Sequence, residues 1–475
     1  MAKKTERPMQ SPTAGSVEPE HDPKLGPLAG FPNVGPIDSI SLTGFKSHRE
    51  TTDIALRPLT LLAGANSSGK SSLLQPLLLI KQTLEAPFEP PPLFLGGPIV
   101  RLDNAEDLFW RGDDGTRVGT FSIGLHVGKV SLRVTYRRDV SANGGLVLDE
   151  TQLRLDGAPQ WYGSRADGSE TVRNKLAPLI EKFTVLLKSF FGDASNSALS
   201  FIPGRCAHDL WLGANIPDKG FQPFLPLPVS LARDEIASIV HLPGLRDGPE
   251  RSYAVTGLSG RFPGRFPEYT ATLLQHWQQQ RDERLEGVFD DLRALALADR
   301  VEAQKLNDRR VELRVSRRMG GAASDMVNIA DVGVGVSQVL PIVVALRAAR
   351  QDQLVHIEQP ELHLHPRAEI ALASLFVAAA RRGARLVLET HSATLLRAFQ
   401  AAVAEDDTGW VQQNLALHWF ARDASGESKV TTAEVQADGS FGDWPVDLNL
   451  VEMEMTRRLL AASHARRAKA AKGSP

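Results

Sequence analysis

The pattern of hydrophobic and polar positions divides the chain into three stretches. In the first, apolar segments at residues 38–43 and 59–63 predict strands, and amphipathic spacing predicts a helix over residues 70–84. In the last, from residue 328, segments typical of helices alternate with short, wholly apolar segments. Such alternation is typical of a parallel sheet with helices on its faces. Together the two stretches predict one α/β unit.

The stretch between them has a mixed pattern. Residues 120–136 and 146–155 alternate apolar and polar side chains, as antiparallel strands do, and helical spacing follows at 170–191 and 270–297. We interpret this stretch as an α+β region inserted into the α/β unit. The predicted division is a flexible N-terminal arm (1–37), the first part of the α/β unit (38–92), the inserted region (93–327), the second part (328–462) and a basic flexible tail (463–475).

Composition and charge narrow the classes of protein. Hydrophobic residues make up 42% of the 475 residues and charged residues 23%, which is an ordinary globular composition. The formal net charge is −2, so no overall positive charge indicates a nucleic acid or an anionic membrane. A single cysteine, Cys206, excludes an internal disulfide. No apolar run reaches the ~20 residues that span a bilayer, and the polar N-terminus lacks a signal-peptide pattern. We expect a cytoplasmic protein without a membrane partner.

A phosphate-binding motif lies between the strand at 59–63 and the helix at 70–84. Residues 64–71 read Gly-Ala-Asn-Ser-Ser-Gly-Lys-Ser and match the Walker A pattern in full. Its glycines let successive backbone N–H groups point at phosphate oxygens, and the following helix N-terminus adds partial positive charge. Lys70 is expected to reach the β- and γ-phosphates of ATP, and the Ser71 hydroxyl to ligate Mg²⁺. The expected nucleotide-binding residues are Gly64, Asn66, Ser67, Ser68, Gly69, Lys70, Ser71 and Ser72.

An acidic residue ends a later apolar segment. Residues 353–358 predict a buried strand that finishes at Glu358, and Pro366 opens the next helix. A P-loop site needs a carboxylate opposite its serine to hold the metal, so we expect Glu358 to be the magnesium carboxylate of a Walker B strand.

Two histidines follow closely after Glu358. His363 and His365 together with Glu361 suggest a zinc site as an alternative. Residues two apart share a face only in an extended strand, and no third strong ligand follows nearby. The sequence therefore favours ordinary structural roles for both histidines.

His391 ends the next predicted strand, residues 384–390. The carboxyl ends of parallel strands lie at the ligand side of such a sheet. Because this strand belongs to the same unit as the P-loop, we expect His391 to contact the γ-phosphate.

Together these motifs resemble the ABC-type ATPase heads of the SMC, RecF and OLD group. They are most similar to AAA-family ATPases that carry a short C-terminal domain of unknown function. The similar segments are 44–47, 64–72, 331–341, 357–366 and 389–392, with further likeness at 242–253 and 443–445. The resemblance implies an ABC-type P-loop NTPase fold, in which a mainly parallel sheet is accompanied by an antiparallel β subdomain.

The resemblance also implies roles for a second segment. Residues 331–338 take the place of the ABC signature loop, in which Ser337 would contact ATP. In such ATPases the signature of one subunit caps the nucleotide held by the P-loop of the other. The resemblance therefore implies a homodimer that closes head to head on ATP.

One position departs from the ABC pattern. The magnesium carboxylate is usually followed by a second acid that polarises the attacking water, and here that position is Gln359. An amide can orient a water molecule but cannot accept its proton. Either Glu361 supplies the base, or hydrolysis is slow and ATP acts mainly as a clamp, which we favour.

Several functions stay open. We expect an ATPase that gates DNA or a separately encoded effector protein, in DNA maintenance or phage defence; the alternative is a nucleotide-sensing scaffold with little hydrolysis. A basic cluster would suit DNA phosphates, although its interleaved acids favour a solvated face. Its members are Arg309, Arg310, Arg314, Arg317 and Arg318. We find neither the heptads of a long coiled coil nor the set of acids of a two-metal nuclease.

Overall fold

The structure is a computed structural model of the chain. It describes residues 35–87, 91–139, 145–155, 162–165, 198–203, 210–216, 220–226, 229–258, 260–316, 320, 325–442 and 457–463. The helix expected at 170–191, the likeness at 443–445 and nearly all of the expected arm and tail lie outside these ranges.

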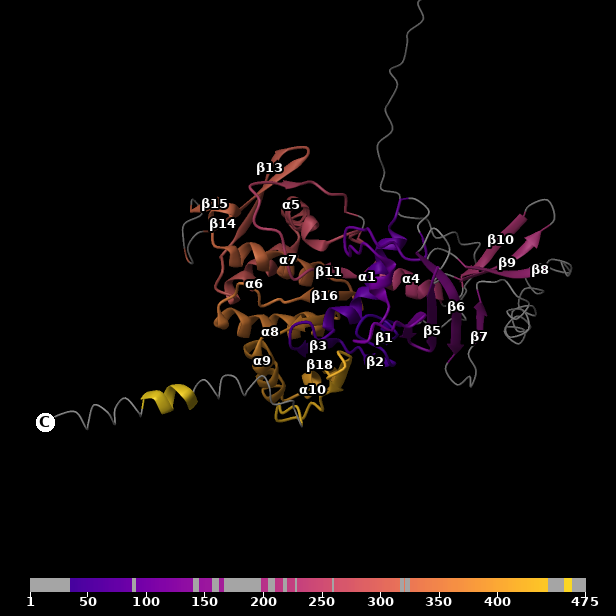
Figure 1. Cartoon of the computed structure of the whole chain (residues 1–475). Coiled ribbons are helices and arrows are strands. Elements are labelled where there is room, and N and C mark those ends of the chain that lie inside the picture. Colours follow the sequence, from indigo (N-terminus) through magenta and orange to yellow (C-terminus); the bar gives the residue numbers. More distant parts are fainter. Residues whose placement is uncertain are drawn as a thin grey trace, which may run out of the picture.

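A six-stranded sheet forms the centre of the molecule (Figure 1). Its strand order is β11-β16-β17-β3-β18-β19, and every neighbouring pair is parallel except β18 with β19. The strands are β11 (Val240–Leu242), β16 (Leu354–Glu358), β17 (Arg385–Thr390), β3 (Leu59–Gly64), β18 (Leu415–Arg422) and β19 (Ser428–Thr432). Because β3 and β17 are buried along their whole length, layers must cover both faces of the sheet.

Helices cover one face of this sheet, which we call the α7 face. They are α5 (Thr270–Gln280), α6 (Glu283–Ala294), α7 (Val334–Ala348), α8 (Pro366–Arg381) and α9 (Ala393–Ala404), followed by the short α10 (Trp410–Asn414). Their apolar side chains form one core cluster with sheet residues such as Leu61, Ile357 and Leu388.

The opposite face, which we call the α1 face, packs on α1 (Lys70–Leu84). A second, antiparallel sheet lies beyond α1, so the helix is enclosed between two sheets (Figure 1). Its order is β2 (Thr52–Ala55), β1 (Ile37–Thr43), β4 (Thr120–Val127), β5 (Val130–Arg138), β6 (Leu146–Leu155) and β7 (Tyr162–Arg165). The helix α4 (Val229–Ala237) packs on α1 from the side.

Two smaller antiparallel sheets complete the described chain. One consists of β8 (Ala198–Pro203), β9 (Leu210–Ile216) and β10 (Gly220–Pro226). The other consists of β12 (Tyr253–Ala254), β13 (Val301–Asn307), β14 (Arg310–Ser316) and β15 (Met326–Asn328). Short 3-10 turns occur at η1 (Ala105–Leu108), η3 (Phe266–Tyr269) and η4 (Ile329–Asp331).

These elements confirm the predicted α/β class, with its parallel sheet and antiparallel β subdomain. The strands and helices expected after residue 328 are all present, and α1 has the predicted bounds. The helical stretch at 270–297 is two helices rather than one. Arg281 adopts a left-handed backbone (φ 53°), and the Asp282 carboxylate then caps α6 by accepting from the Arg284 N–H.

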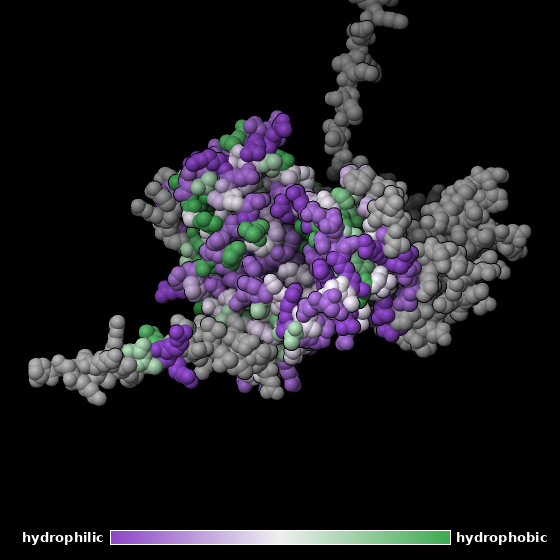
Figure 2. Space-filling view, viewed as in Figure 1, coloured by the Kyte–Doolittle hydropathy of each residue, from purple (hydrophilic) through white to green (hydrophobic). Residues whose placement is uncertain are grey.

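Two segments of the predicted inserted region belong to the two large sheets. Its residues 240–242 are strand β11 of the central sheet, and its strand β4 pairs with β1 of the antiparallel sheet. The division into arm, α/β unit and insertion stays a prediction. On the side seen in Figure 2, hydrophobic residues of the described surface are interspersed among hydrophilic ones. No helix in the described ranges is both long and apolar enough to cross a bilayer.

Candidate functional site

The Walker A motif forms a tight loop between β3 and α1. Gly64 ends the strand at φ 143°, and Gly69 precedes the helix at φ 102°. A Cβ atom at Gly64 would lie 2.1 Å from the Phe420 carbonyl oxygen, and one at Gly69 would lie 2.2 Å from the Ser428 hydroxyl. Both positions therefore require glycine on steric as well as conformational grounds.

Lys70 folds back over the loop that precedes it. Its ammonium donates to the carbonyl oxygens of Gly64 at 3.0 Å and Ala65 at 2.7 Å. Burial lowers the pKa of Lys70 to about 8, against the opposing charges of Glu389 and Glu361. Backbone carbonyls of the loop thus hold the ammonium at the lining of the cavity over the loop.

A cavity of about 880 Å³ opens over this loop. Lys46 and Trp110 are among the residues that line it. Of the residues predicted from the sequence, it is lined by Asn66, Ser67, Ser68, Gly69, Lys70, Ser71, Ser72, Glu358, Gln359 and His391. Gly64, Glu361 and Ser337 lie outside the lining, and Glu389, for which the sequence predicts no role, lies within it.

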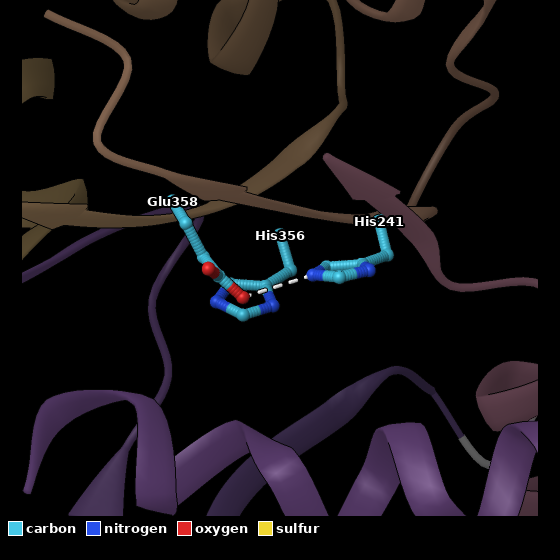
Figure 3. Close-up of side chains that lie close together, drawn as sticks. All are labelled: His241, His356 and Glu358. Atoms are coloured by element: carbon cyan, nitrogen blue, oxygen red, sulfur yellow. Dashed lines mark hydrogen bonds and ion pairs between the residues drawn. The ribbon is translucent and has the colours of Figure 1, made fainter. Parts of the chain in front are cut away.

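Glu358 extends from the carboxyl end of β16 and is held on both oxygens. Its Oε1 accepts from His241 Nε2 at 3.0 Å, and its Oε2 accepts from the Gly244 N–H at 3.0 Å. Burial opposes its charge, but the hydrogen bond from His241 and the nearby histidines lower the pKa of Glu358 to about 2. Figure 3 shows the His241 ring directed at this carboxylate.

Glu389 extends from the next strand, β17, towards the Walker A serine. The Ser71 hydroxyl donates to Glu389 Oε2 at 2.5 Å, and His356 Nε2 lies 2.9 Å from Oε1. Burial alone would lower the pKa of His356, but the hydrogen bond and charge of Glu389 outweigh it and raise the pKa.

His241, His356 and Glu358 lie close together at this end of the sheet (Figure 3), with one possible ligand atom of each within 4.8 Å of the others. The two imidazole rings are stacked, with centroids 5.2 Å apart and planes 23° apart. The Nε2 atoms of the two rings lie at hydrogen-bond distance from different carboxylates, His241 from Glu358 and His356 from Glu389. The cluster is better described as two histidine–carboxylate pairs side by side.

Gln359 follows Glu358 in a left-handed conformation, with φ 43°. Its N–H donates to the Glu389 carbonyl at 2.8 Å, and its own carbonyl accepts from Arg246 Nη2 at 3.2 Å. Arg246 also donates to the carbonyl of Glu358 at 3.3 Å, and burial lowers its pKa to about 10. The turn after β16 is thus held by hydrogen bonds from both sides, and Gln359 is among the residues that line the cavity.

His391 and Glu361 are coupled through the backbone. His391 Nδ1 lies 2.7 Å from the Gly64 carbonyl, which places the ring beside the P-loop. Glu361 Oε1 accepts from the Thr390 hydroxyl at 2.8 Å and from the His391 N–H at 3.0 Å. Glu361 therefore positions the His391 segment in this structure, rather than facing the cavity.

Ser337 lies in the first turn of α7 and is not among the residues that line the cavity. Its hydroxyl donates to the Val334 carbonyl at 2.8 Å. The neighbouring Gln338 donates to the carbonyls of Arg246 and Asp247 at 3.4 and 3.3 Å. The signature-like segment is thereby connected to the loop that holds Glu358.

The structure also locates the alternatives raised by the sequence. His365 caps α8 by accepting from the Arg367 N–H, and the set Glu361, His363 and His365 is not a metal-compatible group in the described chain. In the basic cluster, Arg310 pairs with Glu250 and Arg314 with Glu312. Arg317 and Arg318 lie outside the described residues.

Three residues of the site were missed by the sequence reasoning: His241, His356 and Glu389. A signal was available for two of them, because His356 and Glu389 are ionisable residues inside segments predicted to be buried strands. His241 lies in a three-residue strand, which is too short for any periodicity to reveal.

The donor set fits a nucleotide with Mg²⁺. Hydroxyl and carboxylate oxygens are the ligands that this cation prefers, and Ser71, Glu358 and Glu389 supply them in one cavity. The loop amides at the N-terminus of α1 suit phosphate oxygens.

Comparisons with known proteins bear on this site. Residues 266–397 match the family model of an AAA domain, described as a putative AbiEii toxin of a type IV TA system. No curated protein matches the chain.

Similar solved structures include an SMC head bound to the C-winged helix domain of ScpA, at 14% identity and a TM-score of 0.43, covering 83% of this chain and 97% of that chain. The SMC head domain from Thermotoga maritima is similar at 12% identity and a TM-score of 0.39, with 84% of this chain and 100% of that chain covered. A third structure is an SMC head domain with an extended coiled coil, bound to the C-terminal domain of ScpA derived from Pyrococcus furiosus. It is similar at 12% identity and a TM-score of 0.40, with 89% of this chain and 99% of that chain covered. The AAA match spans α7, β16 and His391, and over that segment it confirms the resemblance to ABC-type AAA ATPases.

Proposed function

We propose that the protein binds ATP with Mg²⁺, hydrolyses it slowly and closes as a head-to-head homodimer on the nucleotide. The observation that carries the proposal is the cavity itself. A complete Walker A loop, two carboxylates from neighbouring strands and His391 line or border one space at the carboxyl ends of parallel strands.

In this proposal different residues of the cavity contact the phosphates and the metal ion. The loop amides and Lys70 bind the β- and γ-phosphates, and Lys70 exchanges its carbonyl partners for phosphate oxygens. Ser71 and the cavity acids, among them Glu358 of the Walker B strand, hold Mg²⁺, which neutralises phosphate charge when bound. His391 contacts the γ-phosphate from the P-loop side.

Slow turnover follows from the identity of residue 359. The Gln359 amide orients a water molecule without accepting its proton. Glu361, the other candidate base, already accepts two hydrogen bonds from the His391 segment. Both observations support a nucleotide that persists as a clamp.

Steady-state ATPase rates test this part of the proposal. We expect a slow wild-type rate, a faster rate for Gln359→Glu and little change for Glu361→Gln, with Lys70→Ala as the inactive control. A fast wild-type rate that Glu361→Gln abolishes would assign the base to Glu361. A fast rate that Glu361→Gln leaves unchanged would exclude both a slow clamp and a Glu361 base.

The dimer is proposed from the separation of two motifs. Ser337 lies outside the nucleotide cavity of its own chain, as expected for a signature segment that acts on the ATP of a second copy. Light scattering coupled to size exclusion, with and without ATP and Mg²⁺, tests closure. We expect a dimer only with ATP, and a monomer for Lys70→Ala under both conditions. A dimer without nucleotide would support a constitutive scaffold instead.

We further propose that the ATP cycle gates a separately encoded effector or DNA in phage defence or DNA maintenance, within the cytoplasm. The family model that matches residues 266–397 is named for a type IV TA system, which favours defence. A nucleotide-sensing scaffold with little hydrolysis is the second candidate, supported by Gln359. Pull-down from native lysate with ATP-bound protein, with and without nuclease, separates protein partners from DNA.

A further inference from the structure

The carboxylate that touches the Walker A serine is not the one that the sequence motif assigns. Ser71 donates to Glu389 Oε2 at 2.5 Å, and Glu389 is 3% exposed while still lining the cavity. Glu358 instead accepts from His241 and the Gly244 N–H. The two acids lie at paired positions of neighbouring strands, with Glu389 on β17, the strand that pairs directly with β3.

The carboxylate of Glu389 contacts a buried histidine through the oxygen that does not contact Ser71. His356, 1% exposed, lies 2.9 Å from its second oxygen and fixes the direction of the carboxylate. Histidine–carboxylate contacts of this kind orient metal ligands in proteins. One oxygen is therefore held by the sheet, and the other is presented to the serine.

We propose that Glu389, positioned by His356, shares Mg²⁺ with the Ser71 hydroxyl, and that Glu358 is the second carboxylate of the pair. The inference rests on the proposed binding of ATP with Mg²⁺. It moves the metal contact from the strand of Glu358 to the strand between it and the P-loop. His356 is a positioning residue in this arrangement, because it reaches the metal only through Glu389.

Nucleotide binding with and without the metal tests the assignment separately from hydrolysis. Fluorescent ATP analogue affinity is measured by anisotropy on the full chain, in EDTA and across a Mg²⁺ titration. With the affinity of each variant compared with its own value in EDTA, we expect Glu389→Gln to need at least tenfold more Mg²⁺ than wild type to reach half of the affinity gain that saturating Mg²⁺ gives. His356→Asn should shift this midpoint by a smaller factor, and the exposed Glu405→Gln should not shift it.

A double variant keeps the test specific. Ser71→Ala removes the other half of the contact, so its effect and that of Glu389→Gln should not add in the double variant. Binding of Mn²⁺ to the nucleotide complex, followed by electron paramagnetic resonance, reports the metal directly.

Two outcomes would overturn the assignment. One is that Mg²⁺ no longer raises the affinity of Glu358→Gln for the ATP analogue but still raises that of Glu389→Gln. The Ser71–Glu389 contact would then be a structural pair. The other is additive effects of Ser71→Ala and Glu389→Gln. If wild type binds no nucleotide in either condition, the proposed function fails instead, so the two failures are distinguishable.

Discussion

The two faces of the central sheet differ sharply although the same strands form both. On the α7 face, residues such as Leu61, Ile357 and Leu388 are fully buried among helices, and the polar exception on β11, β16, β17 and β3 is Thr390 at a strand end. On the α1 face, alternate positions of the same strands carry His241, His356, Glu358 and Glu389. A parallel sheet covered on both faces is ordinarily apolar on both.

The difference shows that one face of the sheet provides apolar packing while the other carries paired ionisable side chains. Each carboxylate on the α1 face is paired with a histidine of the neighbouring strand, two positions back along the chain direction: Glu358 with His241, and Glu389 with His356. The α7 face supplies hydrophobic burial, so the α1 face can carry buried charge towards the P-loop.

The largest expected effect comes from placing a charge on the wrong face. Leu388→Glu puts an unpaired carboxylate among the helices of the α7 face, where Leu388 is 0% exposed. Burying an unpaired charge costs many kcal/mol, which is comparable with the whole stability of about 5–15 kcal/mol. We expect loss of cooperative thermal unfolding by circular dichroism, whereas Leu388→Met should remain folded. A Leu388→Glu protein that melts near wild type would remove the distinction between the faces.

The second effect comes from breaking one pair on the α1 face. His356→Leu leaves Glu389 buried without its partner, which should lower the free energy of unfolding by about 3–5 kcal/mol. His356→Leu with Glu389→Leu should recover most of that loss, because no unpaired charge remains. Urea denaturation of both variants measures this. Additive losses in the double variant would mean that the two residues do not act as a pair.

The third prediction concerns the pH dependence of nucleotide binding. Burial lowers the pKa of Lys70 to about 8, so its ammonium is present below pH 8 and is lost as the pH rises through it. Affinity for an ATP analogue in EDTA should be constant from pH 7 to 7.5 and should fall about tenfold per pH unit well above pH 8.

The matched control is Lys70→Arg, because a guanidinium stays charged over this range. Its affinity should be independent of pH, whatever its absolute value. Glu389→Gln should move the wild-type profile to lower pH, since the charge of Glu389 raises the pKa of Lys70. A wild-type profile that stays flat to pH 9.5 would contradict the lowered pKa.

The smallest expected effect concerns a polar group at the edge of the α7 face. The Ser392 hydroxyl caps α9 by accepting from the Leu395 N–H at 3.0 Å. Ser392→Ala should lower the free energy of unfolding by about 1 kcal/mol, and Ser392→Thr, which keeps the hydroxyl, by less. Thermal unfolding of the two variants measures the difference. An effect as large as that of His356→Leu would mean that edge polar groups matter as much as buried pairs.

Sequence patterns were sufficient for the elements with strong local signals. The glycine–lysine boundary of the Walker A loop fixed the start of α1, and the apolar segments ending at Glu358 and Thr390 predicted β16 and β17. The short strands β2 and β11 were missed. Of the four residues of β2, only Ile54 is buried, and β11 is a strand only because it pairs with β16.

The candidate site was predictable where the chemistry is contiguous in the sequence. The P-loop and His391 follow from motifs, but the Ser71–Glu389 contact joins residues 318 positions apart. It depends on β17 lying between β16 and β3, and strand order is not visible in a periodicity. The role of Glu361 was ambiguous for the same reason, since its partners are Thr390 at the end of that strand and His391 directly after it.

The alternation of the two faces has a consequence for folding. A shift of β16 or β17 by one residue along its neighbours would exchange the faces of every side chain on that strand. Glu358, His356 or Glu389 would then enter the helical core as unpaired charges, while leucines and valines would face α1. Such misaligned sheets are too costly to persist, so the same acids that line the cavity also disfavour incorrect strand registers during assembly of the sheet.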